Sequence, residues 1–548
     1  MKKSVRVVQK LRGTLILNNS LVKVFLLFSL AAFAAVSCSE YRISDSRFES
    51  EAVTDNYRTY YEIFVGGFSD SNKDGIGDLR GLINRLDYLN DGDPNSGRSL
   101  GIEGIWLMPI MPSPSYHKYD TTDYYGIDRR YGTMEDFENL IAECDKRGIK
   151  VIIDLVLNHS SNQHPWFINA RNAITAGNFD DRYTSYYTIE TERITGRTWY
   201  EFAVSPDGTQ YYYEGNFSDQ MPELNMDNPD VLQEIVDIVK FWLDKGVGGF
   251  RLDAVRYIYM GEEARNIEFL KWFAQECRKI KSDVYIVAEN WAGPVSIENY
   301  YEAVNCFDFG MSGSDGEIYY TAQGIASVTE FVERLAIYQR RILAKNSNAI
   351  LNPFISNHDM DRAAGFLDVQ EYIMHTAANL YILSSGSPFI YYGEEIGMKG
   401  SRGSANTDAN RRLGMLWGGN DTVGDPVGTT YDSRLQTNGT VRSQLRQRDS
   451  LLTHYKKLIM LRRANPEIAR GIIEPLDFSS YTTFGGFISN YNGSRVAVFH
   501  NTGPKVTVDL SLYTDVNFTE LRGYAGKGNA TLNGSVLEIS EYTSVVLK

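Results

Sequence analysis

The chain has 548 residues, 43% of them apolar, which is enough to bury a large core in two or three domains. Its 69 acidic residues outnumber 55 basic ones and give a formal net charge of −14 at pH 7. We therefore expect no nucleic-acid partner, because phosphate backbones are bound by basic surfaces. Beyond residue 38 the only cysteines are Cys144, Cys277 and Cys306, without CxxC or Cys/His spacing, so we expect buried thiols rather than disulfides or a zinc site.

The first 37 residues differ from the rest of the chain. They hold six basic residues, no acidic one, and an apolar run at 24–36 that is too short to span a bilayer. The run ends at Ala35-Val36-Ser37, directly before Cys38, which resembles a bacterial lipoprotein signal peptide cleaved before Cys38. An ordinary signal peptidase site nearby is the alternative. We expect an exported protein. Removal of the first 37 residues leaves 49 basic and 69 acidic residues, so the mature chain has a net charge of about −20. We expect it to be lipid-anchored to the bacterial outer membrane or cell surface, or else periplasmic or secreted.

From about residue 55, short β-branched or aromatic runs alternate with helical stretches, which is typical of βα units and a parallel sheet. Eight runs are strand candidates: 60–65, 104–109, 150–157, 249–253, 284–289, 305–309, 350–356 and 388–392. The pattern predicts an α/β fold, a TIM (β/α)8 barrel.

The strand spacing breaks once, between Asn158 and about Met221, in a Tyr-, Thr- and Gly-rich stretch without a clear helix. This predicts a subdomain inserted after the third strand. After about Ile468, strands and turns predict a C-terminal antiparallel β-sandwich. The predicted domains are a signal peptide (1–37), a linker (38–54), the barrel (55–158 and 222–467), the inserted subdomain B (159–221) and the β-sandwich domain (468–548).

Acidic side chains follow two neighbouring strands at their carboxyl ends, where barrels carry their active sites. Asp253 ends the fourth strand, and Arg251 points to the same face because strand side chains alternate. Arg251 would hold that carboxylate ionised, as a nucleophile requires. Glu289 ends the wholly apolar fifth strand, where desolvation would raise its pKa and suit a general acid.

Two more strands end in polar residues. The third carries Asp154 and leads to Asn158-His159, and the seventh leads to Asn357-His358-Asp359. Any one of these could be a helix cap or a turn residue. Together on one barrel face they favour hydrolysis of a glycosidic bond, in which one carboxylate attacks the anomeric carbon and another protonates the leaving oxygen. The sequence has no GxGxxG, GxxxxGK[ST], HExxH or GxSxG motif.

These segments resemble, in the same order, the signature regions of the α-amylase family, glycoside hydrolase family 13. The matching segments are 154–159, 249–254, 287–290 and 354–359, and the resemblance covers roughly residues 58–465. It implies that Asp253 is the nucleophile, Glu289 the acid/base and Asp359 the stabilising carboxylate. It also implies retention of configuration, with the first two carboxyls about 5 to 5.5 Å apart. The implied substrate-binding residues are Tyr119, Asp154, His159, Arg251 and His358.

The resemblance leaves substrate preference open. Segment 221–225, MPELN, is similar to a signature that reads MPDLN in one amylase subfamily and QPDLN in oligo-1,6-glucosidases, with Glu223 in place of Asp. Exo-acting α-glucosidases usually carry an Asp where this chain has Tyr116. We expect a monomeric, α-amylase-type endo-hydrolase of α-1,4-glucans such as starch, glycogen or malto-oligosaccharides. The alternatives are a neopullulanase, a cyclomaltodextrinase, an oligo-1,6- or α-glucosidase and, more remotely, a non-catalytic glucan-binding relative.

The loop at 70–78 places oxygen-bearing groups at every second position around glycines. Its three carboxylates repel one another unless a cation neutralises them. The loop resembles a family site for a structural Ca2+ remote from catalysis, and a solvated acidic turn is the alternative. It is not an EF-hand, because its twelfth position is Gly81. The predicted ligands are Asp70, Asn72, Asp74, the Ile76 carbonyl and Asp78.

Overall fold

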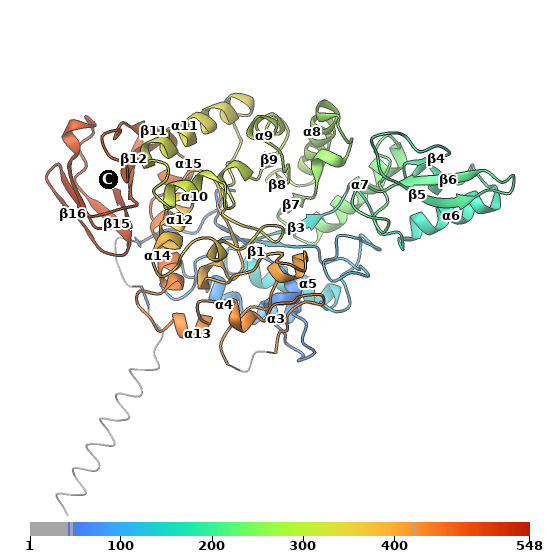
Figure 1. The fold of residues 1–548 in the computed structure, drawn as a ribbon, viewed down its shortest axis with the longest axis horizontal. Coiled ribbons are helices and arrows are strands. Elements are labelled where there is room, and N and C mark those ends of the chain that lie inside the picture. The colour runs from blue at the N-terminus through green and yellow to red at the C-terminus, as the bar shows by residue number, and fades with distance from the viewer. Residues whose placement is uncertain (1–41, 44–47, 420–421) are drawn as a thin grey trace, which may run out of the picture.

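The computed structural model describes residues 42–43, 48–419 and 422–548 (Figure 1). The predicted signal peptide and the anchor at Cys38 lie outside these residues. Within the described ranges, no helix is both long and apolar enough to cross a membrane.

A curled parallel sheet forms the centre of the molecule. Its strand order is β10-β1-β2-β3-β7-β8-β9. The strands are buried almost throughout, as expected for a parallel sheet that is covered on both faces. Their bounds are β1 (Tyr60–Ile63), β2 (Gly104–Leu107), β3 (Lys150–Leu155), β7 (Gly249–Leu252), β8 (Tyr285–Ala288), β9 (Asn305–Cys306) and β10 (Phe389–Tyr391).

The segment 350–356, predicted as the seventh strand, is not a regular strand. Pro353 has no N–H, and the N–H of Asn352 donates to Oδ2 of Asp308 at 2.9 Å, so a regular ladder cannot form. The segment still bridges the open edges of the sheet: Asn352 O accepts from Asp308 N at 3.2 Å, and Pro353 O accepts from Phe389 N at 3.0 Å. The predicted TIM barrel is thus confirmed, with an irregular segment in the place of the seventh strand.

Helices surround this sheet (Figure 1). Two of the long ones begin with capping boxes, Thr133 with Asp136 and Ser327 with Glu330, which satisfy the first backbone N–H groups. The main helices are α5 (Met134–Asp145), α7 (Pro229–Asp244), α8 (Glu263–Ile280), α11 (Val328–Lys345), α12 (Ile373–Ile382) and α14 (Leu451–Arg463). Shorter ones are α2 (Val65–Phe68), α3 (Leu79–Ile83), α4 (Leu86–Leu89), α9 (Pro294–Tyr300), α10 (Glu317–Ala322), α13 (Val441–Gln444) and α15 (Glu467–Arg470).

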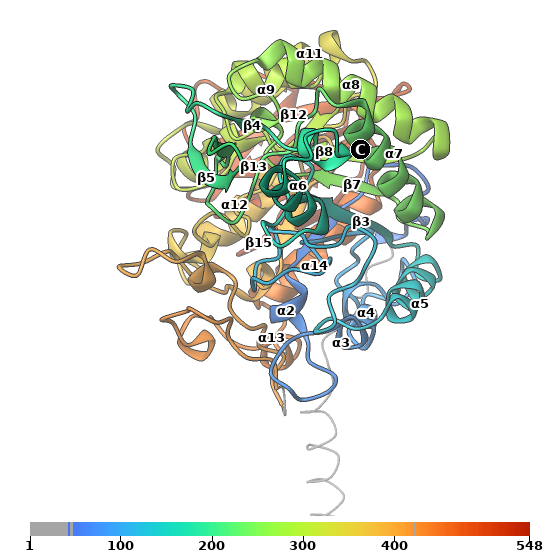
Figure 2. The same cartoon turned by 90° about the vertical axis from the view of Figure 1, so that its right-hand side faces the viewer.

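The segment between β3 and α7 projects from one end of the molecule and faces the viewer in Figure 2. It holds an antiparallel sheet of β4 (Ile189–Glu190), β6 (Gln210–Glu214) and β5 (Trp199–Val204). It also holds helix α6 (Pro165–Ala176), so the expectation of no clear helix here is wrong. Phe167 of α6 packs on Phe202 of β5, with ring centroids 4.7 Å apart.

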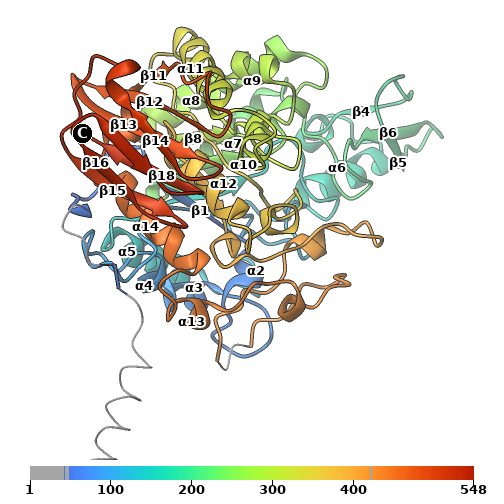
Figure 3. The same ribbon diagram turned by 60° about the vertical axis from the view of Figure 1, so that its left-hand side comes forward.

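The C-terminal part forms two antiparallel sheets (Figure 3). Phe484 and Phe499 of the larger sheet share one buried core with Leu537 of the smaller sheet, which confirms the predicted β-sandwich. The first sheet, in spatial order, is β11 (Ile472–Leu476), β12 (Phe484–Tyr491), β13 (Ser494–Asn501), β18 (Thr543–Leu547) and β15 (Leu521–Gly526). The second is β14 (Val506–Asp509), β17 (Val536–Ile539) and β16 (Ala530–Asn533).

Candidate active site

A cleft of about 1000 Å³ opens at the carboxyl ends of the barrel strands. All three predicted catalytic carboxylates line it, each from a different strand end. Its walls come from the loops after β2, β7, β8, the irregular segment 350–356 and β10, and from the inserted segment. The lining includes Tyr116, His117, Tyr119, His159, Phe217, Met221, Asp253, Arg256, Tyr257, Glu289, Trp291, Asp359, Arg402, Asp408, Arg411 and Arg412.

Arg251 of β7 lies fully buried at the floor of the site and contacts three carboxylates. Its Nη1 donates to Asp154 at 2.9 and 3.0 Å and to Oδ1 of Asp253 at 2.6 Å. Its Nη2 forms an ion pair of 2.9 Å with Oε2 of Glu289. The parallel register, which sets Arg251 opposite Asp154 of β3, brings this cluster together. One guanidinium therefore holds the predicted nucleophile and the predicted acid in the same place.

Glu289 follows β8 and receives a hydrogen bond of 2.9 Å from the backbone N–H of Ala254. Burial, opposed by Arg251 and reinforced by Asp253 and Asp359, raises the pKa of Glu289 to about 7. The protonated form of Glu289 is therefore populated near neutral pH, as a general acid requires. The sequence prediction of a raised pKa at this strand end agrees with this environment.

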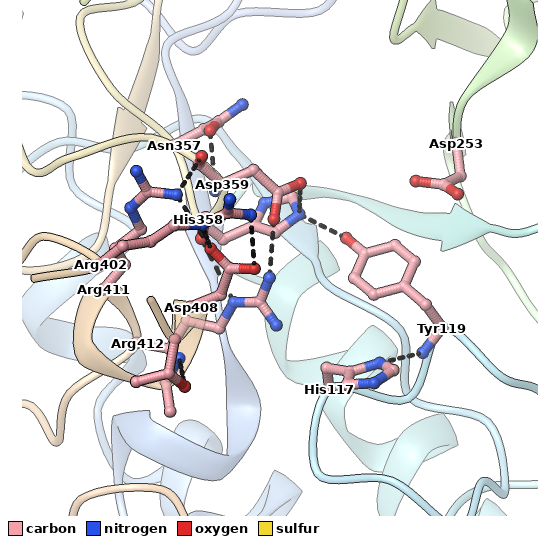
Figure 4. Close-up of polar contacts among 12 residues, drawn as sticks. His117, Tyr119, Asp253, Asn357, His358, Asp359, Arg402, Asp408, Arg411 and Arg412 are labelled. Atoms are coloured by element: carbon pink, nitrogen blue, oxygen red, sulfur yellow. Dashed lines mark hydrogen bonds and ion pairs between the residues drawn. The ribbon is translucent and has the colours of Figure 1, made fainter. Parts of the chain in front are cut away.

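Asp359 lies between two cationic groups (Figure 4). His358 Nε2 is 2.9 Å from Oδ2, and Arg412 donates to Oδ1 at 2.7 Å. Burial opposes the charged form, but His358 and Arg412 outweigh it and hold the pKa of Asp359 well below its usual range. Asp359 is thus an ionised acceptor on the cleft wall.

Tyr119 and His159 line the cleft, as expected of sugar-binding residues. The Tyr119 ring lies parallel to that of His358, at 5.5 Å and 13°, and its hydroxyl donates to Asp154 at 3.1 Å. Burial lowers the pKa of His159, which leaves a neutral imidazole able to exchange hydrogen bonds with hydroxyl groups.

The other three predicted substrate-binding residues, Asp154, Arg251 and His358, do not line the cleft, and like His159 they are at most 1% exposed. They contact the lining side chains from behind and hold them in position.

Sequence reasoning missed several residues of the site. Glu62 of β1 is buried beneath it, 2.6 Å from Nδ1 of His358. A charged residue inside the otherwise apolar run 60–65 was the signal that could have revealed it. Arg412 had no such signal, because its loop carries no periodic pattern. Phe217 and Trp291 are 45% and 46% exposed in the cleft, where sugar rings could stack.

The predicted calcium loop lies between α2 and α3. Its side chains accept backbone N–H groups: Asp70 from Gly75 at 2.9 Å, Asp74 from Ile76 at 2.8 Å, and Asp78 from Gly81 at 2.7 Å, which caps α3. Across the described part of the chain, no three carboxylate, imidazole or thiol groups converge as a metal site. Carboxylate and carbonyl oxygens are the ligands that Ca2+ prefers. Calcium binding at this loop stays a prediction.

With this geometry in place, comparisons with known proteins agree with the barrel and its site. The family model "Alpha amylase, catalytic domain" matches residues 62–471. Alpha-amylase 3 of Dictyoglomus thermophilum is 38% identical over 456 residues, covering 81% of this chain and 84% of its own. An oligo-1,6-glucosidase of Parageobacillus thermoglucosidasius is 29% identical over 496 residues, covering 75% and 84%. The solved structure of Eubacterium rectale Amy13B has a TM-score of 0.84 at 36% identity and covers 93% of this chain and 99% of its own.

The chain belongs to the α-amylase family, the glycoside hydrolases of family 13. It is a glycosidase that acts on α-glucans.

Proposed function

We propose that the enzyme is an α-amylase-type endo-hydrolase that cleaves internal α-1,4 bonds of starch, glycogen or malto-oligosaccharides with retention of configuration. The observation that carries the proposal is the single cleft where Asp253, Glu289 and Asp359 meet, with Arg251 touching the first two. The three carboxylates also argue against a non-catalytic glucan-binding relative.

In the proposed first step, Glu289 donates its proton to the glycosidic oxygen while Asp253 attacks the anomeric carbon. The bond to the leaving sugar breaks, and a glycosyl ester forms on Asp253. Arg251 donates to Oδ1 of Asp253, so Oδ2 is the expected attacking atom. In the second step Glu289, now a carboxylate, takes a proton from water, whose oxygen attacks the same carbon and releases Asp253.

Asp359 acts in both steps without forming a bond. As an ionised acceptor held by His358 and Arg412, it can bind sugar hydroxyls and favour the distorted ring. Tyr119 presents its ring to the same space.

An oligo-1,6-glucosidase or neopullulanase activity is the second candidate, favoured by the similarity to the oligo-1,6-glucosidase named above. Two features support the amylase instead: Met221 opens the segment similar to the amylase signature, and Tyr116 stands where exo-acting relatives carry an Asp. Both side chains line the cleft.

Product analysis on soluble starch, pullulan and maltotriose separates these activities. Endo action on starch yields mixed oligosaccharides early in the reaction. Glucose as the sole early product would instead mean an α-glucosidase, and rapid cleavage of pullulan to products that keep an α-1,6 bond would mean a neopullulanase.

We further propose that the mature protein begins at a lipid-modified Cys38 and binds one structural Ca2+ at the loop 70–78. The anchor rests on the sequence before Cys38. A Cys38→Ala variant is then expected to leave the membrane fraction of the cells that express it, and retention in that fraction would contradict the anchor.

A further inference from the structure

We propose that Glu62 of β1 is a positioning residue for the reaction, which holds His358 in its doubly protonated form. This inference rests on the proposed function, in which Asp359 and His358 serve the cleaved sugar. Nothing in the motif that contains His358 indicates this partner, which lies 296 residues earlier in the chain.

The contacts of His358 place an acceptor oxygen beside each ring nitrogen. Nδ1 lies 2.6 Å from Oε1 of Glu62, whose side chain is buried. Nε2 lies 2.9 Å from Oδ2 of Asp359 and 2.7 Å from the hydroxyl oxygen of Tyr119. The Tyr119 hydroxyl gives its own proton to Asp154, so it accepts from Nε2. Both ring nitrogens are therefore donors, which is the imidazolium form.

The charges around the ring favour this form. Burial alone would keep His358 neutral, but Asp359 and Glu62 outweigh it and raise the pKa of His358 to about 9. The opposing cations approach other atoms: Arg412 donates to the backbone oxygen of His358 at 3.3 Å, and Arg251 lies against Asp154. The titratable and charged groups that face the pair are Glu62 on β1, Tyr119 after β2, Asp154 on β3, Arg251 on β7, Asp359 on the same loop, Tyr391 on β10, and Arg412.

Packing already fixes where the ring lies. Trp106 meets it edge-on at 5.6 Å, and Tyr119 lies parallel to it. These neighbours carry no negative charge that could stabilise the imidazolium. Without Glu62, one ring nitrogen of His358 is expected to lose its proton, and the hydrogen bond from Nε2 to Asp359 would then depend on pH. The role of Glu62 is therefore electrostatic, and a change of charge at constant shape tests it.

The experiment is a pH titration of His358 by NMR on protein labelled with ¹³C at histidine Cε1. The chain has seven histidines, and the signal missing from a His358→Gln variant assigns the residue. The wild type is expected to titrate near pH 9. In Glu62→Gln the midpoint is expected to fall by about one pH unit or more, because the charge of one of its two facing carboxylates is gone.

Glu395→Gln is the matched control. Glu395 is also a fully buried glutamate close to β1, but it accepts from the hydroxyls of Tyr61 and Tyr88 at 2.8 and 2.5 Å. This variant is expected to leave the His358 midpoint unchanged. Glu62→Asp, which keeps the charge, is expected to restore part of the shift. For Glu62→Gln, kcat/KM relative to wild type should fall by about twofold or more between pH 6 and pH 8, following the loss of the imidazolium.

A wild-type midpoint near 6.5, or an unchanged midpoint in a folded Glu62→Gln protein, would overturn the inference. The wild-type titration decides even where the variant does not fold. Failure of the proposed function would show separately, because the product analysis does not depend on the titration.

Discussion

Glu289 and Asp359 are both buried carboxyl groups of one cleft, yet their neighbours shift their pKa values in opposite directions. Among the residues that the structure describes, Glu289 forms its ion pair with Arg251, which also contacts Asp154 and Asp253. Asp359 has two cations of its own, one on each oxygen. One group is thereby kept protonated and the other ionised, and such a separation allows carboxyl groups to take different catalytic roles.

The raised pKa of Glu289 predicts how kcat/KM decreases on the alkaline side of its pH profile. The protonated form is the active acid, so kcat/KM should fall as pH rises through about 7. Initial rates on a chromogenic malto-oligosaccharide between pH 5 and 9 measure this. Glu395→Gln, outside the cleft, should leave this decrease in place, and constant kcat/KM up to pH 9 would contradict the assignment.

A site residue could be predicted from the sequence when a local pattern marks it, and not when its role depends on a partner far away in the chain. Asp253 and Glu289 were predictable because strand ends meet at one face of a barrel, and the rule needs only local patterns. For Glu62 the sequence offered only a charged residue in an apolar run, because its partner His358 lies on a distant segment. The sequence also predicted Asp154, Arg251 and His358 as substrate-binding residues. They lie behind the cleft lining, and their roles stay predictions.

At the scale of elements, seven of the eight predicted strand runs are strands in the described part of the chain, and most are shorter at their carboxyl ends. The run 60–65, for example, becomes β1 (Tyr60–Ile63) followed by α2. The chain leaves the ladder there to form the loops of the site. The remaining run, 350–356, is irregular because Pro353 has no N–H to donate. Helix α6 was missed although Phe167, Ala170 and Ile174 are buried at helical spacing.

The contact between β7 and β8 gives a prediction at this scale. A Cβ on Gly249 would lie 1.9 Å from the backbone oxygen of Tyr285, so Gly249→Ala must push the two strands apart. We expect a stability loss of about 1–3 kcal/mol or more, as for other overpacked cores. Activity should fall more steeply, because Asp253 and Glu289 follow these two strands.

Thermal unfolding and starch hydrolysis of the purified variant check this prediction. Gly365→Ala is the control, since a Cβ there meets nothing within 4 Å. A Gly249→Ala protein with wild-type stability and activity would show that the strand spacing is not critical.

At the scale of the whole molecule, the barrel lies between the inserted segment at one end and the C-terminal sheets at the other (Figure 1). The inserted segment contributes Phe217 and Met221 to the cleft. The C-terminal sheets pack on the barrel helices instead: buried Gln339 of α11 donates to Gly471 O and accepts from Ile473 N, both at 2.9 Å. Their role is therefore expected to be structural.

The calcium proposal predicts a change in the stability of the whole protein. A ligand that binds only the folded state raises its stability, so a chelator should lower the unfolding temperature and added Ca2+ should restore it. Asp74→Asn, an exposed position of the loop, should reduce that difference. An unfolding temperature that does not respond to the chelator in the wild type would contradict a bound structural ion.

The most direct test of the central claim is to trap the glycosyl ester on Asp253. In a Glu289→Gln variant, an α-maltotriosyl fluoride can still react, because fluoride leaves without a proton, whereas the second step lacks its base. Mass spectrometry of the intact protein and its peptides should find one maltotriosyl group, located on Asp253. A glycosyl group on another side chain, or inversion of configuration by the wild type, would contradict the account.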